Sequence, residues 1–298
     1  MQTMKLKFRG GAMLLAASVG MAGLAMSGNV QAQEDKGTVT LAYVEWVSTV
    51  ASTNVVRALL EERGYDVKMS SLSGAAMWQA LSYGDADAIV AAWLPTTHED
   101  YYAKVKDSVV DLGPNLEGTK LGLVVPSYTE MDSIEDIKEN PDALDGQIVG
   151  IDPGAGIMRL TYDVIDEYDL DVDLRTGSGA TMTAALGNAI KNEEDIAVTG
   201  WTPHWMFARW DVKYLDDPKN VYGGAEKIHT IVREGFQEDM PEAAAVLDNF
   251  HWSPEDMEEV MLMNLEEGTD PLENAKKWIA DNRDQVDEWL EGVEETQQ

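Results

Sequence analysis

The chain has 298 residues, of which 54 are acidic and 22 basic, so its formal net charge is −32 at pH 7. This charge excludes nucleic acid as a partner, because a phosphate backbone requires a basic surface. Since 44% of the residues are hydrophobic, the charge indicates a solvated surface suited to a salty medium and not a disordered chain. The sequence contains no cysteine, which excludes disulfides and a lipid-accepting cysteine.

The first 32 residues, 1–32, have the pattern of a secretory signal peptide. Three basic residues precede an apolar stretch at 12–26, and Val30-Gln31-Ala32 supplies small residues before a cleavage point. We expect cleavage after Ala32 and a free periplasmic protein. Because the leader carries three basic residues and no acidic one, its removal would change the net charge from −32 to −35.

The first half of the remaining chain alternates strands and helices. The pattern at 39–46 predicts a strand followed by a loop, and apolar runs predict strands at 67–69, 88–91 and 121–126. Helical patterns predict helices at about 52–63, around Met77 and at about 98–106. The strand at 88–91 leads into Trp93-Leu94-Pro95, so we expect Trp93 just past the carboxyl end of that strand.

The second half repeats this order. The pattern at 147–154 predicts a strand followed by a loop, and a second strand is predicted at 196–198, with a helical stretch around Met182 between them. The last strand leads into Trp201-Thr202-Pro203. Two copies of one plan indicate two α/β lobes. Ligand sites of α/β folds lie at the carboxyl ends of strands, so matching tryptophans predict a site between the lobes.

We therefore predict an α/β protein with two lobes joined by two crossing segments. Lobe one would contain residues 33–126 and 228–292, lobe two residues 127–227, and residues 293–298 would be a tail. The crossing segments would be strands at 121–126 and 228–232.

The segment from Gly235 to about Gly292 is predicted to be helical and to pack on lobe one. Ser253-Pro254 and Asp270-Pro271 are typical helix starts. Trp278 and Trp289 are eleven residues apart, which predicts that both lie on one helical face as core anchors.

Signatures of catalysis are scarce. The sequence has no Gly-Xaa-Ser-Xaa-Gly motif and no phosphate loop, and its four histidines lack the spacing of metal ligands. We therefore expect no catalytic residue, no metal and no cofactor.

Three tryptophans, Trp46, Trp93 and Trp201, each stand where a predicted strand gives way to a loop. Three indole faces suit a weakly hydrated cation that has no N–H group, namely a quaternary ammonium. The alternative is that they are core aromatics, which is how we interpret Trp78, Trp205, Trp210 and Trp252.

The segment Asp152-Pro153-Gly154-Ala155-Gly156-Ile157 is a glycine turn that runs into a helix. Backbone N–H groups at such a helix start favour a small anion, although a tight turn without a ligand has the same pattern. His98 could donate a hydrogen bond to the same anion or could simply cap a helix. We call Trp46, Trp93 and Trp201 the cage, and the backbone N–H groups at the start of the predicted helix the anion seat. A site that combines the two suits a zwitterion such as glycine betaine.

Four segments resemble the substrate-binding proteins of glycine betaine/proline betaine ABC transporters: Val44–Trp46, Ala91–His98, Gly150–Met158 and Thr199–Trp205. The resemblance covers nearly all of the chain after the leader and implies a type II-like periplasmic binding protein with a hinge. It implies that Trp46, Trp93 and Trp201 surround the trimethylammonium group. It also implies that the backbone amides of Gly156 and Ile157, together with His98, hold the carboxylate.

We therefore expect a monomeric periplasmic receptor that delivers glycine betaine to a membrane ABC permease. The alternatives in the same class are receptors for proline betaine, ectoine or choline, although choline has no carboxylate for the anion seat. An enzyme acting on methylated amines would need a placed base or a cofactor, and only His98 is available. A binding protein for a chemoreceptor would have the same sequence features.

Overall fold

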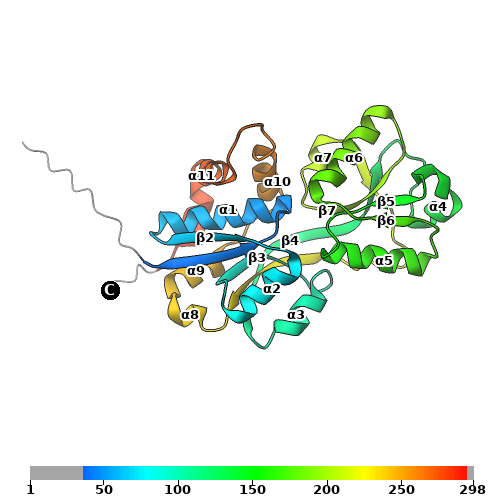
Figure 1. Cartoon of the computed structure of the whole chain (residues 1–298). Coiled ribbons are helices and arrows are strands. Elements are labelled where there is room, and N and C mark those ends of the chain that lie inside the picture. Colours follow the sequence, from blue (N-terminus) through cyan, green and yellow to red (C-terminus); the bar gives the residue numbers. More distant parts are fainter. Residues whose placement is uncertain (1–35, 294–298) are drawn as a thin grey trace, which may run out of the picture. The chain divides into compact units, whose positions relative to one another are not determined.

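The structure is a computed structural model that describes residues 36–293; the signal peptide predicted at 1–32 lies outside the described residues. This part of the chain forms a mixed α/β fold around one sheet of nine strands (Figure 1). The strand order is β2-β1-β3-β9-β4-β7-β5-β6, with β8 beside β4. The expected α/β class is confirmed.

One part of the sheet is built from three strands near the start of the described chain and from the last strand. It contains β1 (Thr38–Tyr43), β2 (Asp66–Ser71), β3 (Ala88–Leu94) and β9 (Glu226–Arg233). Strand β1 runs parallel to β2 and β3, whereas β9 runs antiparallel to β3. The connecting helices are α1 (Val47–Glu62), α2 (Gly74–Tyr83) and α3 (Glu99–Val105).

The other part of the sheet contains β5 (Gln147–Val149), β6 (Asp173–Arg175), β7 (Ala197–Thr202) and β8 (Val212–Tyr214). Strand β5 runs parallel to both β6 and β7. Its helices are α4 (Ile134–Glu139), α5 (Gly156–Tyr168), α6 (Gly179–Asn192) and α7 (Met206–Arg209), with a 3-10 turn at Pro141–Leu144. The repeated order of strand, helix and strand is thus present in both parts.

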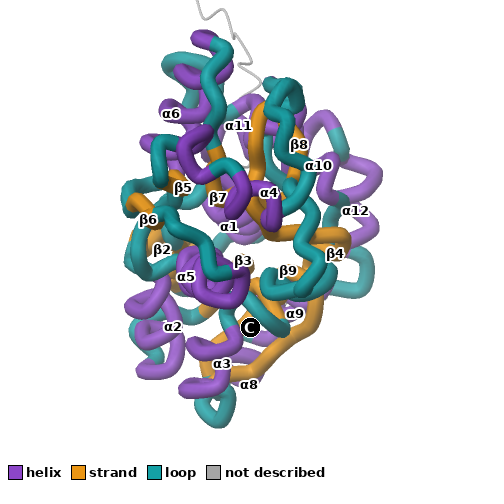
Figure 2. The backbone as a smooth tube through the Cα atoms, turned by 90° about the vertical axis from the view of Figure 1, so that its right-hand side faces the viewer, coloured by secondary structure: helices purple, strands orange, loops and turns teal. Residues whose placement is uncertain are grey.

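Strand β4 (Val109–Pro126) belongs to both parts and is much longer than the strand predicted at 121–126. Its first section, up to Thr119, pairs with β9, and its next section, from Lys120, pairs with β7 (Figures 1 and 2). The pairing with β9 is interrupted by three register shifts. The division into lobes at residues 126 and 227 stays a prediction.

The segment after β9 is helical, as expected. Its helices are α8 (Phe236–Asp239), α9 (Pro241–Asn249), α10 (Pro254–Met263), α11 (Pro271–Asp281) and α12 (Arg283–Leu290), and three of them, α9, α10 and α11, contact α1. The two expected helix starts are confirmed, because Ser253 forms a capping box and Asp270 accepts hydrogen bonds from two backbone N–H groups. Within residues 36–293 no helix combines the length and apolarity that spanning a bilayer would require.

The single helical face expected for Trp278 and Trp289 is wrong. The chain leaves the helix at Asn282, whose side-chain amide and backbone N–H both donate to the carbonyl oxygen of Trp278. An asparagine side chain competes in this way with helix continuation. Both tryptophans are nevertheless core anchors, because their rings stack with centroids 6.0 Å apart and each residue is 1% exposed.

Candidate ligand-binding site

A cavity with about 350 Å³ of empty space, which includes its opening to solvent, brings together all six residues that the sequence predicted for ligand binding. Its lining consists of Trp46, Ser48, Trp93, Thr97, His98, Leu121, Ile151, Ala155, Gly156, Ile157 and Trp201. These residues lie in or next to elements of both parts of the fold, and Leu121 lies in β4. Most of the lining is apolar, and a few polar groups interrupt it.

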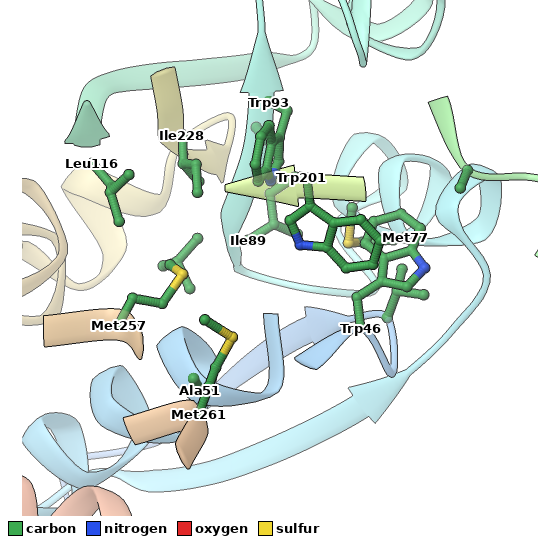
Figure 3. Packing of buried hydrophobic residues seen from close by; sticks show 14 of the residues in the cluster. Trp46, Ala51, Met77, Ile89, Trp93, Leu116, Trp201, Ile228, Met257 and Met261 are labelled. Atoms are coloured by element: carbon green, nitrogen blue, oxygen red, sulfur yellow. The ribbon is translucent and has the colours of Figure 1, made fainter. Parts of the chain in front are cut away.

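The three tryptophans of the cavity come from different elements. Trp46 is the residue before α1, Trp93 lies in β3 and Trp201 lies in β7; they are 8%, 5% and 5% exposed. Figure 3 shows their indoles gathered in one place. The expectation that Trp93 and Trp201 follow their strands is wrong by two residues, because each is the last residue but one of its strand.

Helix α1 begins five residues before the predicted start at Ser52 and therefore directly follows Trp46. The early part of the helix carries Ser48, Thr49 and Ser52, which are all buried. Serine and threonine favour caps and turns, so the sequence pattern did not predict that the helix already begins before Ser52. The backbone of Trp46 is extended, which turns its indole from the start of α1 into the cavity.

Two of these indoles contact neutral histidine rings. The ring of His98 lies 6.0 Å from that of Trp46, and the ring of His204 meets Trp201 edge-on at 4.7 Å. Burial lowers the pKa of His204 to about 3. This side chain is therefore uncharged near neutral pH and does not compete with a cation for the face of Trp201.

The predicted anion seat is the start of α5. Ala155 is its N-cap, and Gly156 and Ile157 are the first two residues of the helix, whose N–H groups have no acceptor within a helix. No acidic residue lies in the first turn. The N–H groups and the helix dipole thus present partial positive charge to the cavity.

His98 lies beside this seat and is 2% exposed. Its Nδ1 accepts a hydrogen bond from the backbone N–H of Trp93 at 3.1 Å. Burial, aided by the charge of Arg159, lowers the pKa of His98 to about 3. The ring is therefore neutral near pH 7 with its proton on Nε2, which makes Nε2 a donor. His98 occupies the N-cap position of α3 but makes no capping hydrogen bond, so the capping role considered for it is wrong.

Glu226 supports the loop that carries His98, and sequence reasoning missed it. This glutamate of β9 is 2% exposed, and its carboxylate accepts hydrogen bonds from the N–H groups of Thr96 and Thr97 and from the Thr97 hydroxyl. In a chain with 54 acidic residues, the residue types around Glu226 do not distinguish it. The one available signal was its position two residues before the strand predicted at 228–232.

The family model that describes the substrate-binding domain of ABC-type glycine betaine transport systems matches residues 37–281 of this chain. The chain belongs to this family. This bears out the resemblance drawn from the four sequence segments, and the family comprises substrate-binding domains of importers and not enzymes. Such domains act outside the cytoplasm, in the periplasm or the extracellular space.

One relative with a known name matches about half of the chain. The glycine betaine/carnitine transport binding protein GbuC of Listeria monocytogenes is 56% identical over 160 residues, which are 53% of this chain and 53% of the relative. The match thus spans about half the length of that protein.

Two solved structures are similar over most of the chain. Lactococcal OpuAC, closed and complexed with glycine betaine, is 47% identical with a TM-score of 0.81 and matches 85% of this chain and 99% of its own. An ABC-transporter choline-binding protein in complex with choline is 31% identical with a TM-score of 0.81 and matches 87% of this chain and 93% of its own.

Proposed function

We propose that this protein binds glycine betaine and delivers it to a membrane ABC permease. The observation that carries the proposal is the cavity, which is lined by three indoles, by the first two residues of α5 and by His98, whose Nε2 is a donor. Glycine betaine has one pole for each group. The ligand would place its trimethylammonium between Trp46, Trp93 and Trp201, and its carboxylate against Gly156, Ile157 and His98.

The energetics of such a site are adequate for a transport receptor. A dissociation constant near one micromolar corresponds to about 8 kcal/mol. Desolvated cation–π contacts contribute up to about 2 kcal/mol each, and charge-assisted hydrogen bonds to the carboxylate add to them. Each of the two opposite charges of the ligand would have its own partner, the indole faces for the cation and the N–H donors for the carboxylate, so neither would be buried unpaired.

The mode of action would be closure of two lobes around the ligand. Lobe one would supply Trp46, Trp93 and His98, and lobe two would supply Trp201 and the start of α5. The ligand stabilises the closed form because only closure completes the site. We further propose that the protein is a monomer, that its signal peptide is removed after Ala32 and that it works in the periplasm.

Choline is the second candidate ligand, because a structural neighbour that covers most of the chain is a choline-binding protein. Choline would fill the indole cage but would leave the N–H groups of Gly156 and Ile157 without a carboxylate. We therefore expect choline to bind more weakly than glycine betaine.

Calorimetry on the purified chain without its leader tests this function. Titration with glycine betaine should give saturable binding near one micromolar, whereas glycine, which has no methyl groups, should not bind. Choline, proline betaine and ectoine should each bind more weakly. If none of these compounds bound, the proposed function would be wrong; if choline bound most tightly, the protein would be a choline receptor.

A further inference from the structure

Asp152 contacts the cage from outside the cavity. It lies between β5 and α5, four residues before Gly156, and it does not belong to the lining of the cavity. Its Oδ2 accepts a hydrogen bond from Nε1–H of Trp46 at 2.7 Å, although the two residues are 106 positions apart in sequence. The edge of one indole is thus bound to the loop that leads into the anion seat.

A second contact holds the same loop. The hydroxyl of Tyr101 donates to the carbonyl oxygen of Gly154 at 2.7 Å. A Cβ atom at Gly74 would lie 3.2 Å from that oxygen and 3.7 Å from both Trp46 and Tyr101, so these groups pack closely around the glycine. Burial and the charges of Asp152 and Asp100 raise the pKa of Tyr101, which therefore keeps its donor proton. The loop has little freedom to move away from Trp46.

The charge of Asp152 is not cancelled by a basic partner. Within residues 36–293 no lysine, arginine or histidine forms an ion pair with it, and nearby Arg159 pairs with Asp100 and Asp163 instead. A carboxylate that accepts from an indole N–H forms a charge-assisted hydrogen bond, and it polarises the ring so that its face becomes more negative. A more negative face attracts a cation more strongly.

We propose that Asp152 is a positioning residue for the cation site: its carboxylate orients Trp46 and strengthens that indole as a wall of the cage. The inference rests on the proposed function, because it concerns how the cage holds a quaternary ammonium. It also couples the two poles of the site, since the segment that fixes Trp46 continues directly into the amides of Gly156 and Ile157.

A double-mutant cycle tests this role through the dissociation constant for glycine betaine. Asp152→Ala removes both acceptor and charge and should weaken binding about tenfold, whereas Asp152→Asn retains an acceptor oxygen and should weaken it about threefold. Trp46→Phe keeps an aromatic face but has no N–H group. In this background Asp152→Ala should cost about twofold or less. Asp171→Asn, an exposed carboxylate beyond the other end of α5, is the control for charge and should leave affinity unchanged.

Two results would overturn the inference. One is an equal loss of affinity from Asp152→Ala with and without the indole N–H, since Asp152 would then not act through Trp46. The other is unchanged affinity in Asp152→Ala. Thermal unfolding without ligand separates a folding defect from the proposed role: both Asp152 variants should still unfold cooperatively and well above the temperature of the titration, although Asp152→Ala should lose some stability because Nε1–H of Trp46 loses its acceptor. The proposed function is tested by wild-type binding alone, so it can stand while this inference fails.

Discussion

Thr97 and Gly156 approach so closely that a Cβ atom at residue 156 would lie 2.1 Å from the carbonyl oxygen of Thr97. The obstacle is backbone, which cannot rotate away as a side chain can. Thr97 follows β3 and Gly156 begins α5, so the contact joins the two parts of the sheet at the ligand cavity. The bare backbone of Gly156 is what permits this approach.

Gly156→Ala should therefore weaken glycine betaine binding by at least a hundredfold while leaving the fold intact. The methyl group would keep Thr97 away from α5 and leave the site incomplete. Gly179→Ala is the matched control, because Gly179 likewise begins a helix and a Cβ atom there would meet nothing within 4 Å. Calorimetry measures both, and equal affinities in the two variants would contradict the prediction.

Trp201→Ala should weaken binding at least tenfold, because it removes one wall of the cage. The comparison is Trp210→Phe, which changes a half-buried indole that packs on Trp205 outside the cavity and should leave the affinity unchanged. Unchanged affinity in Trp201→Ala would exclude this residue from the binding site.

His98 should make the folded protein sensitive to acid. Its pKa is about 3 in the folded protein, whereas an exposed histidine has a pKa of about 6.5. Between these values the unfolded chain binds a proton that the folded chain does not, so this contribution to stability decreases as the pH falls from about 6.5.

His98→Gln removes this proton and its linkage. Melting temperatures measured from pH 7 to pH 4 should therefore fall more steeply for the wild type than for this variant. His251→Gln, at an exposed histidine, should follow the wild-type curve. Parallel curves for the wild type and His98→Gln would show that the prediction is wrong.

Glu226→Ala should weaken glycine betaine binding about tenfold and lower the melting temperature, because the buried N–H groups of Thr96 and Thr97 would lose their acceptor. Glu226→Gln retains one acceptor oxygen and should cost less in both measurements. Glu117→Gln, which removes an exposed carboxylate paired with Lys227, is the control and should change neither value appreciably. The prediction fails if Glu226→Ala binds as tightly as this control.

Salt should stabilise the protein. The 54 acidic residues repel one another, and the repulsion is screened over about 10 Å at 0.1 M salt and about 3 Å at 1 M. The melting temperature should rise by about 5 °C or more between these concentrations of sodium chloride. Sucrose at matched osmolality separates screening from solute exclusion, and a melting temperature that fell with salt would contradict the prediction.

The candidate site could be predicted from the sequence because its residues lie in short local patterns. A strand that leads into Trp-Xaa-Pro and a glycine turn that leads into a helix each follow from a few adjacent residues, and α/β topology gathers such strand ends. The hydrogen bond between Trp46 and Asp152 has no such signal, since it depends on how two distant loops pack. The acceptor role of Glu226 and the full length of β4 depend in the same way on tertiary pairing.

The continuity of β4 limits how the two parts of the sheet can move. Up to Thr119 the strand is hydrogen-bonded to β9, and from Lys120 it is hydrogen-bonded to β7. Hydrogen bonds to β9 and to β7 hold the backbone on the two sides of this point, so we expect bending of β4 to concentrate in the few residues around it. A motion that separates the cage from the anion seat would therefore twist β4 about this short segment, and substitutions at Thr119 or Lys120, which do not line the cavity, would change the rate of opening without contacting the ligand.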